Sequence, residues 1–212
     1  MKIGILGSGL MGGKIGTILS LAGHEVVFSY ARRKDKLNRL AREAGPDARA
    51  GSPTEAVDGA DAVLLAVNWS QMDDVLDQAG DLSGKVVINC SLPLNSSNTE
   101  LVVAHHSSGA EELARRLPAA RIVSAFNTVP SEVLFDVYQG RVPGGPPSVI
   151  YCSDDEDAKL IAAELIRTMG FEPIDAGPLR LARSTEPFAL LVGQLAYQIM
   201  PSPALWYRFG CL

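Results

Sequence analysis

The stretch Lys2-Ile3-Gly4-Ile5-Leu6-Gly7-Ser8-Gly9-Leu10-Met11-Gly12 decides the fold of this chain. Residues 2–6 form a short apolar run typical of a buried strand, and residues 10–22 follow at helical spacing. Residues 24–29 then form a second strand-like run. A strand, a glycine-rich turn, a helix and a strand in this order make one βαβ unit. In that context the G-x-G-x-x-G pattern indicates a site for a dinucleotide.

Each glycine of the turn has its own physical reason. Gly7 allows the chain to turn sharply off the strand, and Gly9 leaves room for a pyrophosphate against the backbone. Gly12 lets the helix lie close to the sheet, while the free N–H groups at the helix N-terminus attract phosphate. We therefore predict a Rossmann-type fold whose cofactor-binding turn consists of Gly7, Ser8, Gly9, Leu10, Met11 and Gly12.

The residues after the second strand distinguish between the two common dinucleotides. NAD-binding units usually place an acid here for the ribose 2′-hydroxyl, whereas the 2′-phosphate of NADP needs cations. Residues 29–34 read Ser-Tyr-Ala-Arg-Arg-Lys, with no acid before Asp35. The alternative is that these cations only open a solvated helix, but cations are unfavourable at a helix N-terminus. We predict NADP(H), whose adenosine end would contact Ser29, Tyr30, Arg32 and Arg33.

Composition excludes several other classes of function. The 212 residues carry a formal net charge of -5, and their one cationic cluster is at residues 32–34. Nucleic-acid binding needs a basic surface, so we expect no nucleic-acid partner. No apolar run reaches the roughly 18–20 residues of a membrane span. The N-terminus runs directly into a strand rather than into a secretory signal. We expect a soluble cytoplasmic protein that does not interact with membranes.

Metal binding is not indicated either. Cys90, Cys152 and Cys211 are widely spaced and show no paired ligand pattern. His105 and His106 lie in a loop-like stretch, residues 95–110, without a carboxylate or thiol at ligand spacing. A solvated histidine pair is therefore favoured over a metal site or acid–base chemistry.

Apolar runs at residues 61–67, 85–90 and 121–126 alternate with helical patterns. This alternation predicts an α/β fold with a doubly wound, mostly parallel sheet, in which ligands bind beyond the carboxyl ends of the strands. The candidate residues just past those ends are Asn68, Trp69, Ser91, Leu92, Pro93 and Asn127. We expect Asn68 and Ser91 to bond a nicotinamide ribose or carboxamide, and Trp69 and Leu92 to form an apolar wall. Each could instead be ordinary loop structure.

A break rich in glycine and proline, residues 140–147, predicts a domain boundary between residues 1–143 and 144–212. The second part contains strand-like runs at 148–152 and 171–175. The pattern S-x-x-E opens a helix at Ser153, as it also does at Ser52 in the first part. A terminal helix carries apolar residues on several sides, so it packs in a core, in a dimer interface or against an apolar ligand. Its main stripe is Phe188, Leu191, Val192, Leu195 and Ile199.

Together these motifs resemble the F420-dependent NADP reductases and the related NADP-dependent dinucleotide-binding oxidoreductases. The similarity runs the length of the chain. It consists of the glycine-rich turn, residues 23–27 (Gly-His-Glu-Val-Val) with Ser29 and the arginine pair, residues 67–69 (Val-Asn-Trp), residues 123–128 (Val-Ser-Ala-Phe-Asn-Thr) and residues 175–179 (Asp-Ala-Gly-Pro-Leu). The last two motifs are the more specific, because a generic Rossmann protein has no reason to share them.

The resemblance implies a cofactor domain and a small C-terminal domain that completes an apolar pocket for F420 or a flavin. By the same analogy, Ser8, Ser29, Arg32 and Arg33 serve the adenosine phosphate end. Asn68, Trp69 and Ala125 lie near the nicotinamide, and Leu191 and Leu195 lie near the acceptor. Ala189 stands where the family has a threonine near the deazaflavin.

We therefore expect an NADPH-dependent oxidoreductase that transfers hydride to F420 or a flavin. Such a transfer needs proximity and a dry slot more than an acid or base, and no catalytic residue is assigned. The alternatives are a reductase of a small imine or carbonyl, similar to pyrroline-5-carboxylate reductase, and an NADP-binding sensor without turnover. The expected partners are the small redox acceptor and a second copy of the chain, joined through the C-terminal helix.

Overall fold

The structure is a computed structural model that describes residues 1–31 and 33–210. Its strands are β1 (Lys2–Leu6), β2 (Glu25–Ser29), β3 (Ala48–Ala50), β4 (Ala62–Leu65), β5 (Val86–Asn89), β6 (Arg121–Ala125), β7 (Ser148–Ser153) and β8 (Glu172–Asp175). Its helices are α1 (Leu10–Leu21), α2 (Lys34–Ala44), α3 (Pro53–Val57), α4 (Met72–Ala79), α5 (Gly109–Arg116), α6 (Leu134–Tyr138), α7 (Glu156–Thr168) and α8 (Ala182–Gln194). Short 3-10 turns occur at Trp69–Gln71, Ser131–Val133 and Leu179–Leu181, and a π-helical turn occurs at Leu195–Ile199.

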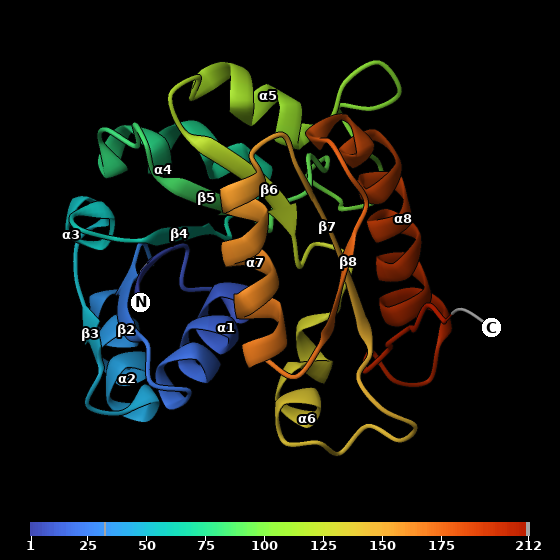
Figure 1. Ribbon diagram of the computed structural model, residues 1–212, viewed down its shortest axis with the longest axis horizontal. Coiled ribbons are helices and arrows are strands. Elements are labelled where there is room, and N and C mark those ends of the chain that lie inside the picture. The colour runs from blue at the N-terminus through green and yellow to red at the C-terminus, as the bar shows by residue number, and fades with distance from the viewer. Residues whose placement is uncertain (32, 211–212) are drawn as a thin grey trace.

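These strands form one sheet in the order β3-β2-β1-β4-β5-β6-β7-β8 (Figure 1). Neighbouring strands are parallel except β6 and β7, which are antiparallel. The strand order reverses between β1 and β4, which is the point where ligands bind in doubly wound sheets. The predicted fold class, an α/β Rossmann-type doubly wound and mostly parallel sheet, is confirmed.

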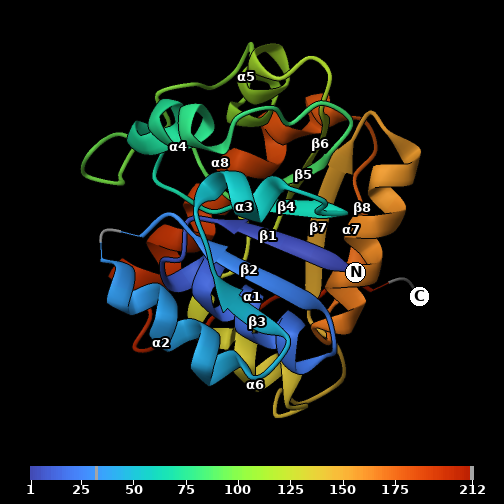
Figure 2. The ribbon, with the colours of Figure 1, turned by 90° about the vertical axis from the view of Figure 1, so that its left-hand side faces the viewer.

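Helices cover both faces of the sheet and divide the core into two layers. One buried cluster joins the sheet to α1, α2, α6 and α7, and the other joins it to α3, α4, α5 and the start of α8. Figure 2 shows α3, α4 and α5 on one side of β1 and β2, and α1, α2 and α6 on the other. Because both faces are covered, strands β4 and β5 are buried along their whole length, as their continuous apolar runs predict.

The register of the sheet brings the ends of the central strands to one edge. Leu6 pairs with Leu65, Leu65 with Asn89, and Asn89 with Ser124. The segments that follow β1, β4, β5 and β6 therefore begin at the same level. This edge contains most of the residues predicted to bind ligand.

Strands β7 and β8 extend the same sheet rather than forming a separate one. Both parts of the chain contribute strands to this one sheet. The domain boundary at residue 143 stays a prediction. Two short elements, β3 and α6, were not expected from the sequence. The S-x-x-E pattern caps α3 at Ser52 as predicted, with both reciprocal hydrogen bonds present.

The same pattern at Ser153 does not act as a cap. Ser153 pairs with Val123 inside the sheet, and its hydroxyl donates to the Ile122 carbonyl over 2.6 Å. The cap of α7 is Asp155 instead, whose carboxylate accepts from the Ala158 N–H over 2.8 Å. The strand therefore continues through the serine and the helix begins later than predicted.

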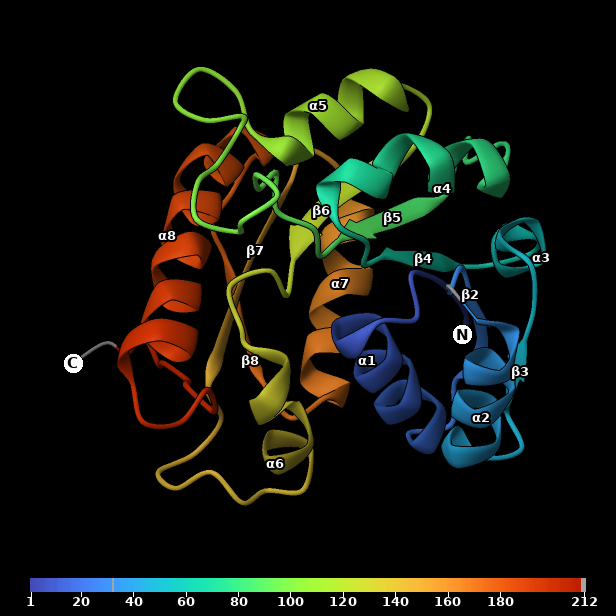
Figure 3. The ribbon, with the colours of Figure 1, turned by 180° about the vertical axis from the view of Figure 1, so that it is seen from behind.

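Helix α8 is anchored to α5 by a buried carboxylate. Glu186 is 1% exposed and accepts from the N–H groups of Gly109 and Ala110 over 2.8 and 2.9 Å. Burial raises the pKa of Glu186 to about 7, although these two donors favour its charged form. Arg183 adds a two-bond pair with Glu111, over 2.8 and 2.6 Å. Figure 3 shows α8 beside α5 and the segment that leads into it.

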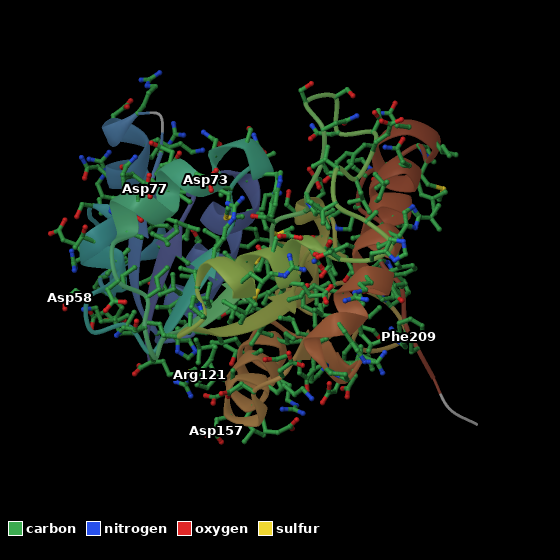
Figure 4. The ribbon with its side chains drawn as sticks, turned by 90° about the horizontal axis from the view of Figure 1, so that it is seen from above. Asp58, Asp73, Asp77, Arg121, Asp157 and Phe209 are labelled. Carbon is green, nitrogen blue, oxygen red and sulfur yellow. The ribbon has the colours of Figure 1, made fainter. Side chains whose placement is uncertain are left out.

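The chain after α8 folds back onto the sheet. The Tyr207 carbonyl accepts from the Ser148 N–H over 2.8 Å, and the Phe209 N–H donates to the Ser148 hydroxyl over 3.0 Å. Figure 4 shows Phe209 beside α8, far from the acidic outer surface of α4 with Asp73 and Asp77. The terminal helix is less buried than expected, because Leu191 and Ile199 are 54% and 68% exposed. The predicted homodimer through this helix stays a prediction.

Candidate functional site

The glycine-rich turn is packed too tightly for side chains at two positions. Gly7 has a φ of 105°, and a Cβ there would lie 2.4 Å from the Ala66 carbonyl oxygen. A Cβ on Gly12 would lie 2.1 Å from the Gly7 carbonyl oxygen. Only glycine therefore lets α1 begin directly against the turn and the end of β4. This close approach points the N-terminus of α1 at the ligand-binding edge of the sheet.

Gly9 behaves differently, because nothing lies within 4 Å of a Cβ built on it. Gly9 caps α1 without a side-chain hydrogen bond, and the first turn of the helix contains no acidic residue. The backbone N–H groups and the positive end of the helix dipole thus face open space. These residues fit the pyrophosphate of a dinucleotide, which is an anion of matching charge.

Ser8 and Ser29 join this turn to the neighbouring strand. The Ser8 hydroxyl donates to the Ser29 carbonyl over 2.9 Å, and the Ser29 hydroxyl donates to the Ile5 carbonyl over 2.7 Å. Both serines are buried, with Ser29 fully inaccessible. These bonds fix the turn against β1 and β2, and the phosphate contacts expected of the two serines stay predictions.

A cavity of about 440 Å³ lies beyond the end of β2, where the adenosine end of a dinucleotide is expected. Tyr30 has a φ of 53°, unusual for a residue other than glycine, and its hydroxyl donates to Asp74 over 2.5 Å. Gln78 also donates to Asp74, over 3.0 Å. Burial and the Asp74 carboxylate raise the pKa of Tyr30 to about 12. The lining residues are Tyr30, Ala31, Leu37, Gly51, Ser52, Pro53, Gln71, Asp74 and Gln78.

Arg33 already has a carboxylate partner. Its guanidinium donates to Asp35 through Nε over 3.0 Å, and the side chain is 77% exposed. This pair holds the pKa of Asp35 below its usual range. Exposed ion pairs contribute little stability, so an incoming phosphate can exchange with the Asp35 carboxylate at low cost. Arg32, the other predicted phosphate ligand, lies outside the described residues.

A second cavity, of about 450 Å³, lies between the glycine-rich turn and α8. We call it the acceptor cavity. Five segments contribute to it: the start of α1, the chain after β5, the loop at 97–99, the chain after β6, and α8 with the π-helical turn. The lining residues are Leu10, Met11, Leu92, Leu94, Ser97, Asn98, Thr99, Asn127, Thr128, Val129, Pro130, Ser131, Ala189, Leu190, Val192, Gly193, Gln194, Tyr197 and Gln198.

The chain after β6 is held in a strained conformation at this cavity. Phe126 is fully buried with a φ of 64°, which is uncommon for a bulky side chain and costs roughly 1–3 kcal/mol. Asn127 stabilises the segment by donating to the Ser124 hydroxyl over 3.1 Å. From the tail after α8, the Tyr207 hydroxyl donates to the Thr128 hydroxyl over 2.7 Å. Strain of this kind concentrates at binding sites.

The opposite wall is tied together by α8 and the π-helical turn. The Gln194 amide donates to the Asn98 carbonyl over 3.3 Å, which joins α8 to the loop at 97–99. The Tyr197 hydroxyl donates to the Glu132 carboxylate over 2.6 Å. Burial and this carboxylate raise the pKa of Tyr197 to about 12. Turns of π-helix are rare and frequently occur at functional sites.

Four of the predicted residues come together at the acceptor cavity, namely Leu10, Met11, Leu92 and Asn127. Others at the same edge do not line it. The Ser91 hydroxyl donates to the Val67 carbonyl over 2.7 Å and so joins the chain after β4 to the chain after β5. Ala125, at the end of β6, is fully buried in the core, and its expected position beside the nicotinamide stays a prediction.

The predicted aromatic wall is also placed differently. The Trp69 ring packs under the Arg116 guanidinium, 5.6 Å from its centroid, and lines neither cavity. Asn68 is exposed and begins the short turn that contains Trp69. Neither residue contacts the acceptor cavity in the described part of the chain.

On α8 the predicted face is off by one residue. Leu191 is 54% exposed, and neither it nor Leu195 lines the cavity. The residues of α8 that line the cavity are Ala189, Leu190, Val192, Gly193 and Gln194. A stripe of small residues beside large ones is the signal that would have identified this face, because small side chains leave room for a flat ligand.

Few titratable groups are present at the acceptor cavity. Among its described lining residues, Tyr197 alone carries an ionisable side chain.

Nowhere in residues 1–31 and 33–210 do three His, Cys, Asp or Glu side chains gather as they would around a metal ion. No helix in these same residues is long and apolar enough to cross a membrane.

Comparison with known proteins extends these observations. Residues 2–93 match the family of NADP oxidoreductases described as coenzyme F420-dependent. A crystal structure from Arthrobacter sp. FB24, provisionally assigned as an F420-dependent NADP reductase, superposes over 100% of both chains with a TM-score of 0.87 and 26% identity. A reductive aminase from Aspergillus terreus with bound NADPH shares the fold alone, with a TM-score of 0.67 and 18% identity over 92% of this chain and 61% of that one.

Among curated proteins, the metalloreductase STEAP3 of Rattus norvegicus is 32% identical over 189 residues. The match includes 89% of this chain but only 36% of the rat protein. The metalloreductase STEAP2 of Homo sapiens is 28% identical, and the match covers 90% of this chain and 36% of the human protein. The chain thus spans about a third of the length of these relatives, 36% in each case. The match of residues 2–93 to this family and the full-length superposition confirm the predicted resemblance to the F420-dependent NADP oxidoreductases.

Proposed function

We propose that this chain transfers hydride from NADPH to a flavin or deazaflavin ring bound in the acceptor cavity. The observation that carries the proposal is the position of this cavity. It adjoins Leu10 and Met11 of the phosphate-binding turn, and its walls are mostly apolar. Two flat rings can stack in such a slot, and enforced proximity supplies much of the rate of a transfer between them.

Bound NADPH would supply the hydride from its nicotinamide ring. The residues of the chain would bind NADPH and orient its nicotinamide ring. Gly9 and the N-terminus of α1 receive the pyrophosphate, while Asn127 retains an amide oxygen that no described residue uses and that can accept from the nicotinamide carboxamide. Leu92 and Val192 would offer apolar surface to the two rings.

The absence of an acid at this cavity argues against an imine or carbonyl substrate. Such substrates develop charge on one nitrogen or oxygen and require a positioned proton donor. Tyr197 is the one ionisable side chain among the described lining residues, and its proton is held by Glu132. A reduced flavin or deazaflavin delocalises its charge and needs no donor from the protein.

The test is anaerobic oxidation of NADPH with F420, FMN, FAD and riboflavin offered in turn. Turnover with any of them above the rate without protein supports the proposal, and the NADH rate measures cofactor preference. Tight NADPH binding without turnover on any ring would instead favour the sensor that lacks catalysis. Turnover of cyclic imines under the same conditions would favour the small-substrate reductase.

The similarity to metalloreductases favours one extension. Electrons could reach ferric iron through the released flavin, each reduced flavin giving two electrons to two ferric ions. This route needs no metal site in the chain itself. It predicts that ferric reduction requires NADPH, protein and free flavin together, and that omitting the flavin abolishes it.

A further inference from the structure

We propose that the Tyr207 hydroxyl is a positioning group for hydride transfer, because it holds residues 126–128 in place at the acceptor cavity. This role rests on the proposed function and adds to it a residue from a distant part of the chain. Tyr207 itself does not line the cavity. It acts through Thr128, which does, and through the neighbouring Asn127.

The bond between Tyr207 and Thr128 lies away from solvent. The Tyr207 hydroxyl donates to the Thr128 hydroxyl over 2.7 Å, and Thr128 is fully buried. Among the described residues, Tyr207 is the one side chain that bonds to this hydroxyl. A buried hydroxyl without a partner is unfavourable, so the bond favours a single position of Thr128.

The segment that contains Thr128 is strained and needs support from elsewhere in the fold. Phe126 is buried with a φ of 64°, a conformation that persists only where surrounding contacts hold it. Asn127 is fixed by its bond to the Ser124 hydroxyl over 3.1 Å, and Tyr207 fixes the residue directly after it. The Asn127 amide is thus held from both directions along the chain, at the place where we propose that it accepts from the nicotinamide carboxamide.

Tyr207 is held in place independently of Thr128. Its ring packs edge-on against Phe188 of α8, with 5.1 Å between the ring centroids, and against Phe209 with 5.6 Å between them. Its carbonyl accepts from the Ser148 N–H of β7 over 2.8 Å. Removing the hydroxyl alone should therefore leave the ring and the tail where they are, and change only the contact with Thr128.

The same side chain joins the supports of two cavity walls. Phe188 directly precedes Ala189, which lines the cavity from α8, while Thr128 lines it from the chain after β6. Hydride transfer needs reacting atoms about 3–3.5 Å apart, and a misplacement of about 1 Å can lower the rate by about a hundredfold. A residue that fixes one wall relative to the other therefore acts on the rate of transfer more than on binding.

Tyr207 is not proposed as an acid or a base. A hydride passes with its two electrons from NADPH to the acceptor ring, and the reduced ring takes one proton from water. Burial raises the pKa of Tyr207, and its hydroxyl bonds to Thr128 rather than to a group inside the cavity. The residue thus sets the geometry of the transfer and keeps its proton throughout.

The two partners can be changed with little loss of volume. Tyr207→Phe removes the donor and keeps the ring contacts with Phe188 and Phe209. Thr128→Val removes the hydroxyl that accepts, and Thr128→Ser puts a hydroxyl back. Tyr138→Phe is the matched control, because Tyr138 belongs to α6 and lines neither of the two cavities.

The first measurement is the single-turnover rate of NADPH oxidation with F420 and with FMN, anaerobically and at saturating acceptor. We expect Tyr207→Phe and Thr128→Val each to slow the transfer by about three- to tenfold, the contribution of about one hydrogen bond. The half-saturating acceptor concentration should change by less than about twofold, since the loss is in the transition state. Tyr138→Phe should transfer hydride at the wild-type rate.

The combined variants distinguish a shared bond from two separate defects. The double variant Tyr207→Phe/Thr128→Val should be no slower than the slower single variant, because both remove the same hydrogen bond. Thr128→Ser should recover most of the rate that Thr128→Val loses. A Tyr207→Phe rate within about twofold of the wild type, or losses that multiply in the double variant, would overturn the proposal.

A second measurement needs no turnover and separates this proposal from the proposed function. The fluorescence of bound NADPH reports the surroundings of its nicotinamide, and 2′-phospho-ADP-ribose, which lacks that ring, measures binding of the rest. In Tyr207→Phe the emission of bound NADPH should shift toward that of free NADPH, while the affinity for 2′-phospho-ADP-ribose stays within about twofold.

If neither F420 nor FMN is reduced, hydride transfer to these rings is refuted, and the emission alone then tests Tyr207. A shifted emission in Tyr207→Phe would still support its positioning of the nicotinamide. An emission identical to that of the wild type would overturn it. A protein that binds no NADPH would contradict both the proposed function and the role of Tyr207.

Discussion

Substituting Gly9 by alanine should separate cofactor binding from folding. No atom lies within 4 Å of a Cβ at this position, so the ligand-free fold can accept the methyl group. Alanine caps a helix less well than glycine, which costs about 1 kcal/mol at most and lowers the Tm by about 2–4 °C. The variant should therefore be folded and nearly as stable as the wild type.

NADPH binding should fall much further. The methyl group would occupy the space in which the pyrophosphate approaches the N-terminus of α1. Displacing one phosphate oxygen from a backbone N–H removes a hydrogen bond to a charged group, worth about 1.5–3 kcal/mol. That corresponds to a loss of about 10- to 150-fold in affinity, measured by calorimetric titration.

Gly13→Ala provides the matched control. It lies in α1 outside the G-x-G-x-x-G pattern, and a Cβ there would meet the Leu40 side chain at an ordinary 3.4 Å. Alanine inside a helix is about 1 kcal/mol more favourable than glycine, so this variant should be at least as stable and bind NADPH normally. A Gly9→Ala protein that binds NADPH within about twofold of the wild type would refute the placement of the pyrophosphate.

Three further substitutions test other parts of the account. Gly12→Ala should destabilise the fold by about 1–3 kcal/mol in urea unfolding, because its Cβ would lie 2.1 Å from the Gly7 carbonyl oxygen. Asp35→Asn frees Arg33 and should tighten NADPH binding by at most about fivefold at low salt, without changing the NADH affinity. Burial raises the pKa of Glu186 from the ordinary 4.5 to about 7 in the folded state. Between pH 4.5 and 7 the folded protein therefore keeps the Glu186 carboxyl protonated while the unfolded chain loses that proton. The free energy of unfolding should fall by up to about 3 kcal/mol as the pH rises through this range. Glu186→Gln should remove that decline in thermal unfolding between pH 4.5 and 7, and an unchanged slope would contradict the assignment.

Local patterns predicted the fold well where one signal dominated. The βαβ unit follows from the spacing of its glycines, and the packing explains why: Gly7 and Gly12 admit no side chain. Patterns failed where tertiary pairing competed with local propensity. Ser153 matches the same capping signature as Ser52, but its pairing with Val123 in the sheet takes priority.

The candidate site was less predictable, because its walls come from segments far apart in the chain. Leu92 and Asn127 were identified from their places after strands. Leu191 was not on the expected face of α8, since an apolar stripe does not show which side faces a cavity and which faces solvent. Tyr207 could not be assigned from sequence either, as its contact with Thr128 spans 79 residues.

The central claim is direct hydride transfer to a stacked ring, and isotope transfer tests it most directly. NADPH deuterated on one face of its nicotinamide C4 would be mixed anaerobically with 5-deazariboflavin, an uncharged deazaflavin that accepts hydride at carbon. The account predicts that deuterium from one face alone appears in the reduced deazaflavin, as read by mass spectrometry. Reduced product without deuterium from either face, or equal transfer from both faces, would contradict it.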